Sequence, residues 1–201
     1  MINIALSTYD FSNDYCFEQL KDILKPGLRV CIIPYSHDDE VYEDIEKFNH
    51  IYDCNDITSD YHAIAKSYRD YGIEHIRIIH PNDNELMIKD KIFRSDILFF
   101  TGGDPVKMMK RLESIVDILE QFDGIVMGAS AGAMVQTKEF VMFGEGYEYG
   151  YHKGLGMIDI DVDLLVHFKI DKEMTYIIMR SMIERPDTLL FGIVDGECFI
   201  Y

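Results

Sequence analysis

The architecture of this protein can be read outward from residues 124–135, Gly-Ile-Val-Met-Gly-Ala-Ser-Ala-Gly-Ala-Met-Val. An apolar run that predicts a strand leads directly into small residues on both sides of Ser130, and a helical stretch follows. A nucleophilic serine on a tight strand-to-helix turn needs small neighbours, because the chain crowds itself there and its backbone is strained. We therefore predict a nucleophile elbow at Ser130. The alternative is a glycine-rich turn in which Ser130 only caps the helix.

Short apolar runs alternate with longer amphipathic stretches on both sides of this turn. Strands are expected at residues 2–6, 29–34, 76–79, 97–100, 124–128, 162–168, 189–194 and 198–201, and helices at 15–24, 38–52, 60–71, 85–93, 105–122 and 172–184. Apolar strands separated by helices are typical of a mostly parallel sheet covered on both faces. We predict an α/β three-layer sandwich, with one domain over residues 1–201 and the elbow at a strand carboxyl end.

Two further segments have a distinct composition. Residues 141–156 are rich in glycine and tyrosine, which favours an ordered loop or short hairpin over the strand ends. The last two strands flank Asp195 and Gly196, a pair that predicts a hairpin turn between them.

A second glycine turn is expected beside the elbow, because ligands in such sheets bind at the carboxyl ends of strands. Gly102 and Gly103 follow the strand at 97–100. The helix start after the elbow offers the Ala131 N–H to an oxyanion, and Gly103 is well placed to offer a second. Asp104 is expected to cap the next helix, although its charge could instead favour a substrate amino group. Gly102 and Asp104 are therefore candidate substrate-binding residues.

A serine nucleophile needs a base, usually a histidine that a carboxylate orients. His167 ends an apolar strand downstream of the elbow, so its ring is expected at the same sheet edge. A purely structural His167 is the alternative, and His152, in the glycine-tyrosine segment, is the rival base. The other histidines all precede the elbow and are interpreted as structural or surface residues.

The charge and cysteine content exclude several function classes. The chain carries 36 acidic and 19 basic residues, a formal net charge of −17, which repels phosphate backbones and anionic membranes. Nucleic acid is therefore not an expected partner, and the apolar runs are far shorter than the roughly 18 residues of a membrane span. The four cysteines form no C-x-x-C pair, so no metal and no cofactor are expected. Reduced thiols and the lack of a signal peptide predict a cytoplasmic protein. A homodimer is compatible with these features.

Four segments of the chain together resemble the dipeptidase E and cyanophycinase family of serine peptidases. They are residues 99–104, 128–133, 154–156 and 167–168, and the resemblance extends in order over nearly the whole chain. It implies a class I glutamine-amidotransferase-like fold. Position by position, it also implies Ser130 as nucleophile, His167 as base, and the amides of Gly103 and Ala131 as the oxyanion hole.

The resemblance also implies a third triad member, an acidic residue in the loop about fifteen positions after the serine. This chain has Glu145 there, where dipeptidase E has an aspartate. Glu148 and Glu139 are close enough in sequence to be alternatives.

The chain departs from dipeptidase E where that enzyme reads an amino-terminal aspartate with an arginine. Residues 169–176, after His167, contain no arginine; the expected place falls near Tyr176, and Arg180 lies one turn further on. A neutral phenol cannot pair bidentately with a carboxylate as a guanidinium does. Strict specificity for aspartyl peptides is therefore not expected.

These features predict a serine peptidase that hydrolyses short peptides through an acyl-enzyme, as an exo- or dipeptidase. The alternative is a catalytically silent member of the fold that binds a small molecule or a protein partner. A glutaminase of the amidotransferase type is disfavoured, because that chemistry uses cysteine at the elbow and this chain has Ser130 there.

Overall fold

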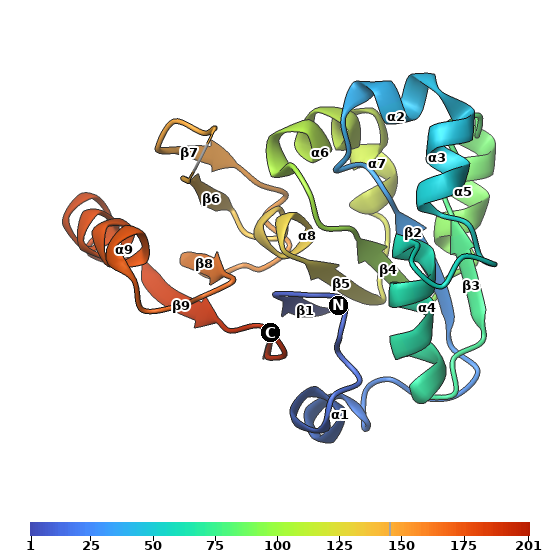
Figure 1. The fold of residues 1–201 in the computed structure, drawn as a ribbon, viewed down its shortest axis with the longest axis horizontal. Helices are drawn as coiled ribbons and strands as arrows, with labels where there is room; N and C mark the ends of the chain where they lie inside the picture. Colours follow the sequence, from blue (N-terminus) through green and yellow to red (C-terminus); the bar gives the residue numbers. More distant parts are fainter. Residues whose placement is uncertain (145) are drawn as a thin grey trace.

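The computed structural model describes residues 1–144 and 146–201 and centres on one mixed sheet (Figure 1). Within these ranges its six strands follow the order β10-β1-β5-β4-β2-β3, with every neighbouring pair parallel except β10 and β1. The strands are β1 (Ile2–Leu6), β2 (Arg29–Ile33), β3 (His75–Ile78), β4 (Ile97–Phe100), β5 (Ile125–Ala129) and β10 (Cys198–Ile200).

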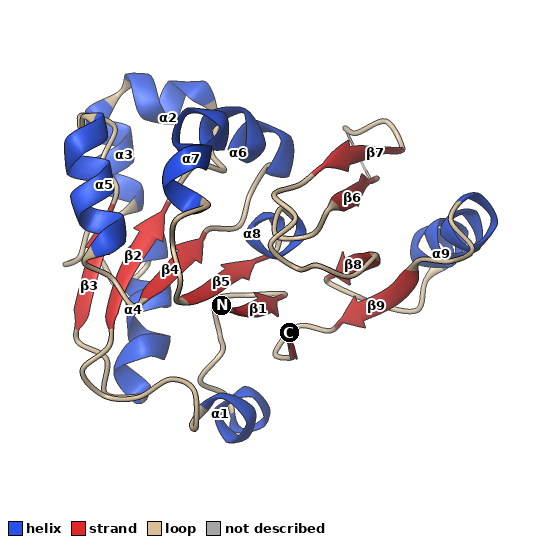
Figure 2. Ribbon diagram, turned by 180° about the vertical axis from the view of Figure 1, so that it is seen from behind, coloured by secondary structure: helices blue, strands red, loops and turns tan. Residues whose placement is uncertain are grey.

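Helices cover both faces of this sheet, as the non-alternating apolar strands predict (Figure 2). The apolar side chains of α1 (Asp14–Leu20) and α4 (Asp60–Asp70) pack on one face. Those of α5 (Glu85–Phe93), α6 (Pro105–Leu112) and α7 (Val116–Leu119) pack on the other. In β2 the alternate residues Val30 and Ile32 join the first cluster, and Cys31 and Ile33 join the second. The predicted α/β three-layer architecture is confirmed.

The remaining elements lie together beyond the β10–β1 side of the sheet, away from β3 (Figures 1 and 2). The glycine-tyrosine segment forms an antiparallel hairpin of β6 (Glu139–Met142) and β7 (Gly150–Lys153). Next to it, β8 (Val162–Val166) and β9 (Leu189–Ile193) form a separate parallel pair, with α9 (Lys172–Glu184) connecting them. Leu164 and Ile193 of this pair pack against Ala5 of β1 and Ala133 of α8 (Ala131–Met134).

The hairpin predicted around Asp195 and Gly196 is wrong. β9 pairs with β8, whereas β10 crosses to the exposed edge of β1, and a turn with Gly196 at φ +87° separates them. An unpaired edge strand leaves a row of backbone groups without partners, and β10 satisfies those of β1 through pairs such as Leu6 with Cys198.

Two of the predicted helices are divided. The stretch 38–52 forms α2 (Asp39–Glu43) and α3 (Ile45–Ile51), because Asp44 leaves the helical conformation and its side chain caps α3. The stretch 105–122 forms α6, a 3₁₀ turn at Glu113–Ile115 and α7. Among the described residues, no helix is long and apolar enough to cross a membrane.

Candidate active site

Ser130 lies on a tight turn between β5 and α8, with φ 51° and ψ −113°. A positive φ is rare for a residue with a side chain, so this backbone conformation is strained. Its glycine neighbours are required by close packing: a Cβ on Gly128 would lie 2.1 Å from the Gly132 carbonyl oxygen, and one on Gly132 would lie 2.2 Å from that of Phe100. The Ser130 amide donates to the Leu6 carbonyl at 2.9 Å, which fixes the turn to β1.

His167 directly follows β8 and contacts Ser130 through its ring. Its Nε2 lies 3.1 Å from Ser130 Oγ, a hydrogen-bond distance that is typical of a nucleophile and its base. The backbone of His167 also has a positive φ, 52°, and its amide donates to Ser7 Oγ at 2.7 Å. Two strained residues therefore face each other across one hydrogen bond, a pattern that is common at functional sites.

Asp195, which follows β9, is the carboxylate that contacts the other ring nitrogen. Its Oδ1 lies 2.8 Å from His167 Nδ1, and it accepts a second hydrogen bond from Ser7 Oγ at 2.6 Å. The Ser7 hydrogen bond, followed by that of His167, holds the pKa of Asp195 below its ordinary value. An ionised carboxylate on Nδ1 favours the tautomer with its proton there, which leaves Nε2 free to accept the Ser130 proton.

In the part of the chain that the structure describes, none of the glutamates expected as the third triad member contacts the His167 imidazole. Glu145 lies outside the described residues, and the contact with Nδ1 that the resemblance implied for it is made by Asp195. Glu139 instead forms an ion pair with Arg185, with Oε2 3.3 Å from Nη2. A signal for Asp195 is present in the sequence, because it follows an apolar strand directly. What the sequence does not show is that this strand lies parallel to β8.

His152, the rival base, lies on β7. Its ring stacks on that of Phe140, with centroids 5.6 Å apart and an interplanar angle of 18°. It therefore packs in the hairpin, whereas His167 contacts Ser130.

The two expected oxyanion donors are the amides of Gly103 and Ala131. Within the described ranges, neither amide donates to a protein acceptor. Both residues are close to Ser130: Gly103 lines the two cavities beside it, and Ala131 is the next residue in the chain. Gly103 has φ +141°, and a Cβ there would lie 2.8 Å from the Ser36 carbonyl oxygen. This turn therefore accepts only glycine without movement of the backbone.

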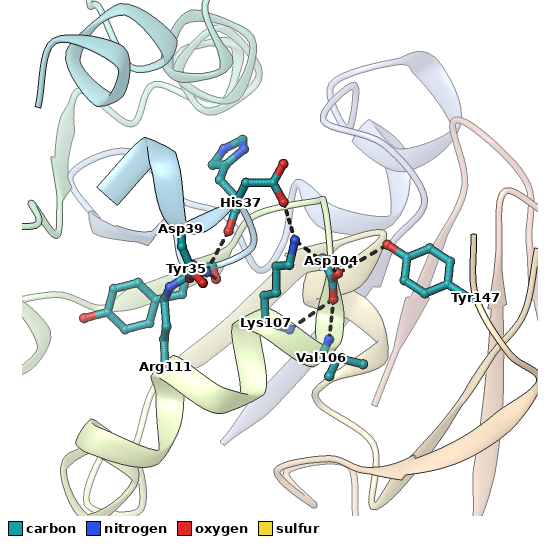
Figure 3. Close-up of polar contacts among 9 residues, drawn as sticks. Tyr35, His37, Asp39, Asp104, Val106, Lys107, Arg111 and Tyr147 are labelled. Carbon is teal, nitrogen blue, oxygen red and sulfur yellow. Dashed lines mark hydrogen bonds and ion pairs between the residues drawn. The ribbon is translucent and has the colours of Figure 1, made fainter. Parts of the chain in front are cut away.

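The two candidate substrate-binding residues already have protein partners. The Gly102 amide donates to the Tyr9 hydroxyl at 2.8 Å, and burial, then the nearby Asp60 carboxylate, raises the pKa of that phenol. Asp104 is the N-cap of α6, where Oδ1 accepts from the Val106 amide at 2.8 Å (Figure 3). The capping role expected for Asp104 is confirmed.

Arg180 lies on α9 and contacts the glycine-tyrosine segment. Its guanidinium forms an ion pair with Glu184, with Nη2 2.8 Å from Oε1, and lies 3.6 Å from the centre of the Tyr149 ring. Tyr176 is 55% exposed on the same helix. Neither residue lines the cavities beside Ser130.

Comparison with known proteins identifies the family. Residues 4–201 match the model of "Peptidase family S51". Among solved structures, the chain is similar to a "Putative Peptidase E Protein" from Listeria monocytogenes EGD-e, with 17% identity, a TM-score of 0.61, and coverage of 100% of this chain and 93% of that one. At this identity the likeness shows the fold alone. A comparison with curated protein sequences gives no match. Because the family match extends over nearly all of the chain, the protein belongs to peptidase family S51, the dipeptidase E family, and is a serine-type peptidase.

Proposed function

We propose that this protein hydrolyses short peptides through an acyl-enzyme formed on Ser130, with His167 as base and Asp195 as the third member of the triad. One observation carries the proposal: a continuous hydrogen-bonded series joins the three side chains, at 3.1 Å from Ser130 Oγ to His167 Nε2 and 2.8 Å from Nδ1 to Asp195 Oδ1.

The proposed reaction begins when His167 Nε2 takes the hydroxyl proton of Ser130 as Oγ attacks the scissile carbonyl carbon. The carbonyl oxygen becomes negatively charged and accepts hydrogen bonds from the Gly103 and Ala131 amides. The C–N bond then breaks, and the imidazolium gives its proton to the leaving amine. Water, deprotonated by the same Nε2, attacks the acyl carbon; the bond from this carbon to Ser130 Oγ then breaks, the imidazolium returns its proton to Oγ, and the acid is released. Asp195 stabilises the imidazolium in both steps.

The size of the site supports a short substrate. Two cavities, each of about 310 Å³, flank Ser130 and share Gly103 and His167 in their walls. Small-molecule sites generally measure roughly 300–1,000 Å³, so each cavity is at the small end of that range. Phe143 and Tyr147, which follow β6 in the chain, and Glu173 and Met174 of the first turn of α9 line one of them. We also propose a cytoplasmic setting, since all four cysteines are free thiols, as is typical of reducing compartments.

The test is the substitution Ser130→Ala, assayed with a dipeptide panel and with a serine-directed phosphonate. We expect turnover and labelling to be lost, whereas the matched substitution Ser114→Ala, at an exposed serine outside both cavities, should preserve them. Circular dichroism and thermal melting establish that each variant is folded. Unchanged turnover in Ser130→Ala would refute the nucleophile assignment. A folded wild-type protein that neither cleaves the panel nor reacts with the phosphonate would instead indicate the catalytically silent alternative.

A further inference from the structure

We infer that the cavity between β6, β8 and α9 binds an apolar side chain, that of the substrate residue whose carbonyl Ser130 attacks. The inference rests on the proposed function and adds the class of substrate. The cavity adjoins Ser130, His167 and Gly103, so a side chain bound in it extends directly from the reacting centre. Its wall is mainly apolar, formed by Met134, Val141, Met142, Phe143, Leu164 and Met174.

The apolar wall is assembled from elements that also carry the catalytic groups. β8 contributes Leu164 and leads directly to His167, and α8 begins at Ala131 and ends at Met134. A carbonyl held at the start of this one-turn helix therefore places its own side chain within reach of Met134. Methionine side chains are unbranched and flexible, so a wall that also includes Met142 and Met174 can adapt to apolar side chains of different shape.

The charged groups of the same cavity disfavour an acidic side chain. Lys169 is the only cation among the described lining residues, and its Nζ is paired with Asp171 Oδ2 at 3.2 Å. Glu173 adds a second carboxylate to the lining. A substrate carboxylate would therefore lose water in a lining whose lysine is already paired with Asp171 and whose remaining charge, that of Glu173, has the same sign as its own.

Among the residues that the structure describes, the mouth of the cavity provides no unpaired cation either. Tyr147, which lines the cavity, donates to Asp104 Oδ2 at 3.3 Å (Figure 3). The nearby Lys107 is paired with Asp38 and lies 3.9 Å from the same Asp104 oxygen. The second cavity beside Ser130 is lined by the more polar Ser7, Thr8 and Tyr9 together with glycine and alanine, so the large apolar side chains are confined to one side of the nucleophile.

The test measures the rate at which Ser130 reacts with aminoalkyl diphenyl phosphonates that carry the side chains of leucine, methionine, phenylalanine, aspartate and lysine. The side chain of such a reagent takes the place of that of the acylating residue. We expect the three apolar reagents to react roughly 10- to 100-fold faster than the aspartate reagent, the range that one hydrophobic pocket gives between unlike side chains. An aspartate reagent that reacts as fast as the leucine reagent would overturn the inference but leave the proposed function intact. Failure of every reagent, with no peptide turnover, would overturn the proposed function itself.

A substitution in the wall provides the second arm. Phe143→Arg adds a cation to the cavity at a partly exposed position, so we expect the leucine-to-aspartate rate ratio to fall at least tenfold. Phe191→Arg is the matched control, because Phe191 lies on β9, is 41% exposed and does not line the cavity. Thermal melting checks that both variants are folded. If Phe143→Arg does not fold, the rates of the five reagents with the wild-type protein decide whether the cavity binds apolar side chains. An unchanged ratio in folded Phe143→Arg would contradict the assignment of this cavity.

Discussion

Substitution of Asp195 by asparagine tests which carboxylate orients the base. Asparagine keeps the shape of the side chain and can still accept the hydrogen bond from Ser7 Oγ, 2.6 Å away in the native protein. It removes the negative charge that lies 2.8 Å from His167 Nδ1. In the flipped orientation, its amide NH2 takes the place of Oδ1, gives up the Ser7 hydrogen bond and donates to that nitrogen, which would favour the tautomer that protonates Nε2 and blocks proton transfer from Ser130.

The size of the effect follows from Coulomb's law with allowance for solvent. At the observed 2.8 Å, an imidazolium–carboxylate pair interacts by about 1.5 kcal/mol in bulk water and about 6 kcal/mol at an effective dielectric constant of 20. The side chains of His167 and Asp195 are 50% and 61% exposed, so solvent screening places the value in the lower half of that range. A loss of about 2–3 kcal/mol corresponds to a roughly 30- to 150-fold fall in kcat/KM.

The assay is steady-state hydrolysis of the best dipeptide of the panel, measured in parallel for Asp195→Asn, Glu145→Gln and Glu148→Gln. We expect the fall in Asp195→Asn alone, and mainly in kcat, because Asp195 acts on the imidazole and does not line either cavity beside Ser130. A value within threefold of wild type for Asp195→Asn, with a large fall for Glu145→Gln, would show that the series of hydrogen bonds is not the catalytic one.

Three further substitutions test a hydrogen bond and a turn of the site and a buried ion pair of the fold. Ser7→Ala removes the main hydrogen bond that lowers the pKa of Asp195, so this pKa should rise toward its ordinary value, which ¹³C NMR of the carboxyl group can measure. The low pKa contributes stability that is present above the unfolded-state pKa and is lost as the pH falls through the folded-state pKa, and this contribution should become smaller in the variant. Gly103→Ala places a Cβ 2.8 Å from a neighbouring carbonyl oxygen at φ +141°, so the displaced oxyanion donor should lower kcat about 100-fold or more in steady-state assays, with a smaller change in KM. Arg185→Leu leaves the fully buried Asp163 carboxylate without the guanidinium 2.6 Å from its Oδ1, and urea unfolding should show a loss of about 3–5 kcal/mol; a loss below 1 kcal/mol would refute that pairing.

The features that the sequence specifies locally are those whose physical cause lies within a few residues. The apolar runs of β2, β4 and β5 must be covered on both faces, and their pattern is enough to predict a parallel sheet with helices on each side. The elbow at Ser130 is equally local, since the small residues that its backbone requires are its immediate neighbours. His167 follows from the same logic, as a histidine at the end of an apolar strand.

The partner of His167 depends on contacts between distant segments, and only the tertiary structure determines it. Asp195 is 28 residues from His167 and 188 from Ser7 in sequence, and these contacts exist because β9 lies parallel to β8 while β10 pairs with β1. A Gly-containing turn after an apolar strand is as compatible with a hairpin as with a crossing to another sheet edge. Packing of β8 and β9 on β1 and α8 selects the crossing. The proposed nucleophile and base can therefore be inferred from short stretches of sequence, whereas the carboxylate proposed to orient the base and the apolar cavity require the folded chain.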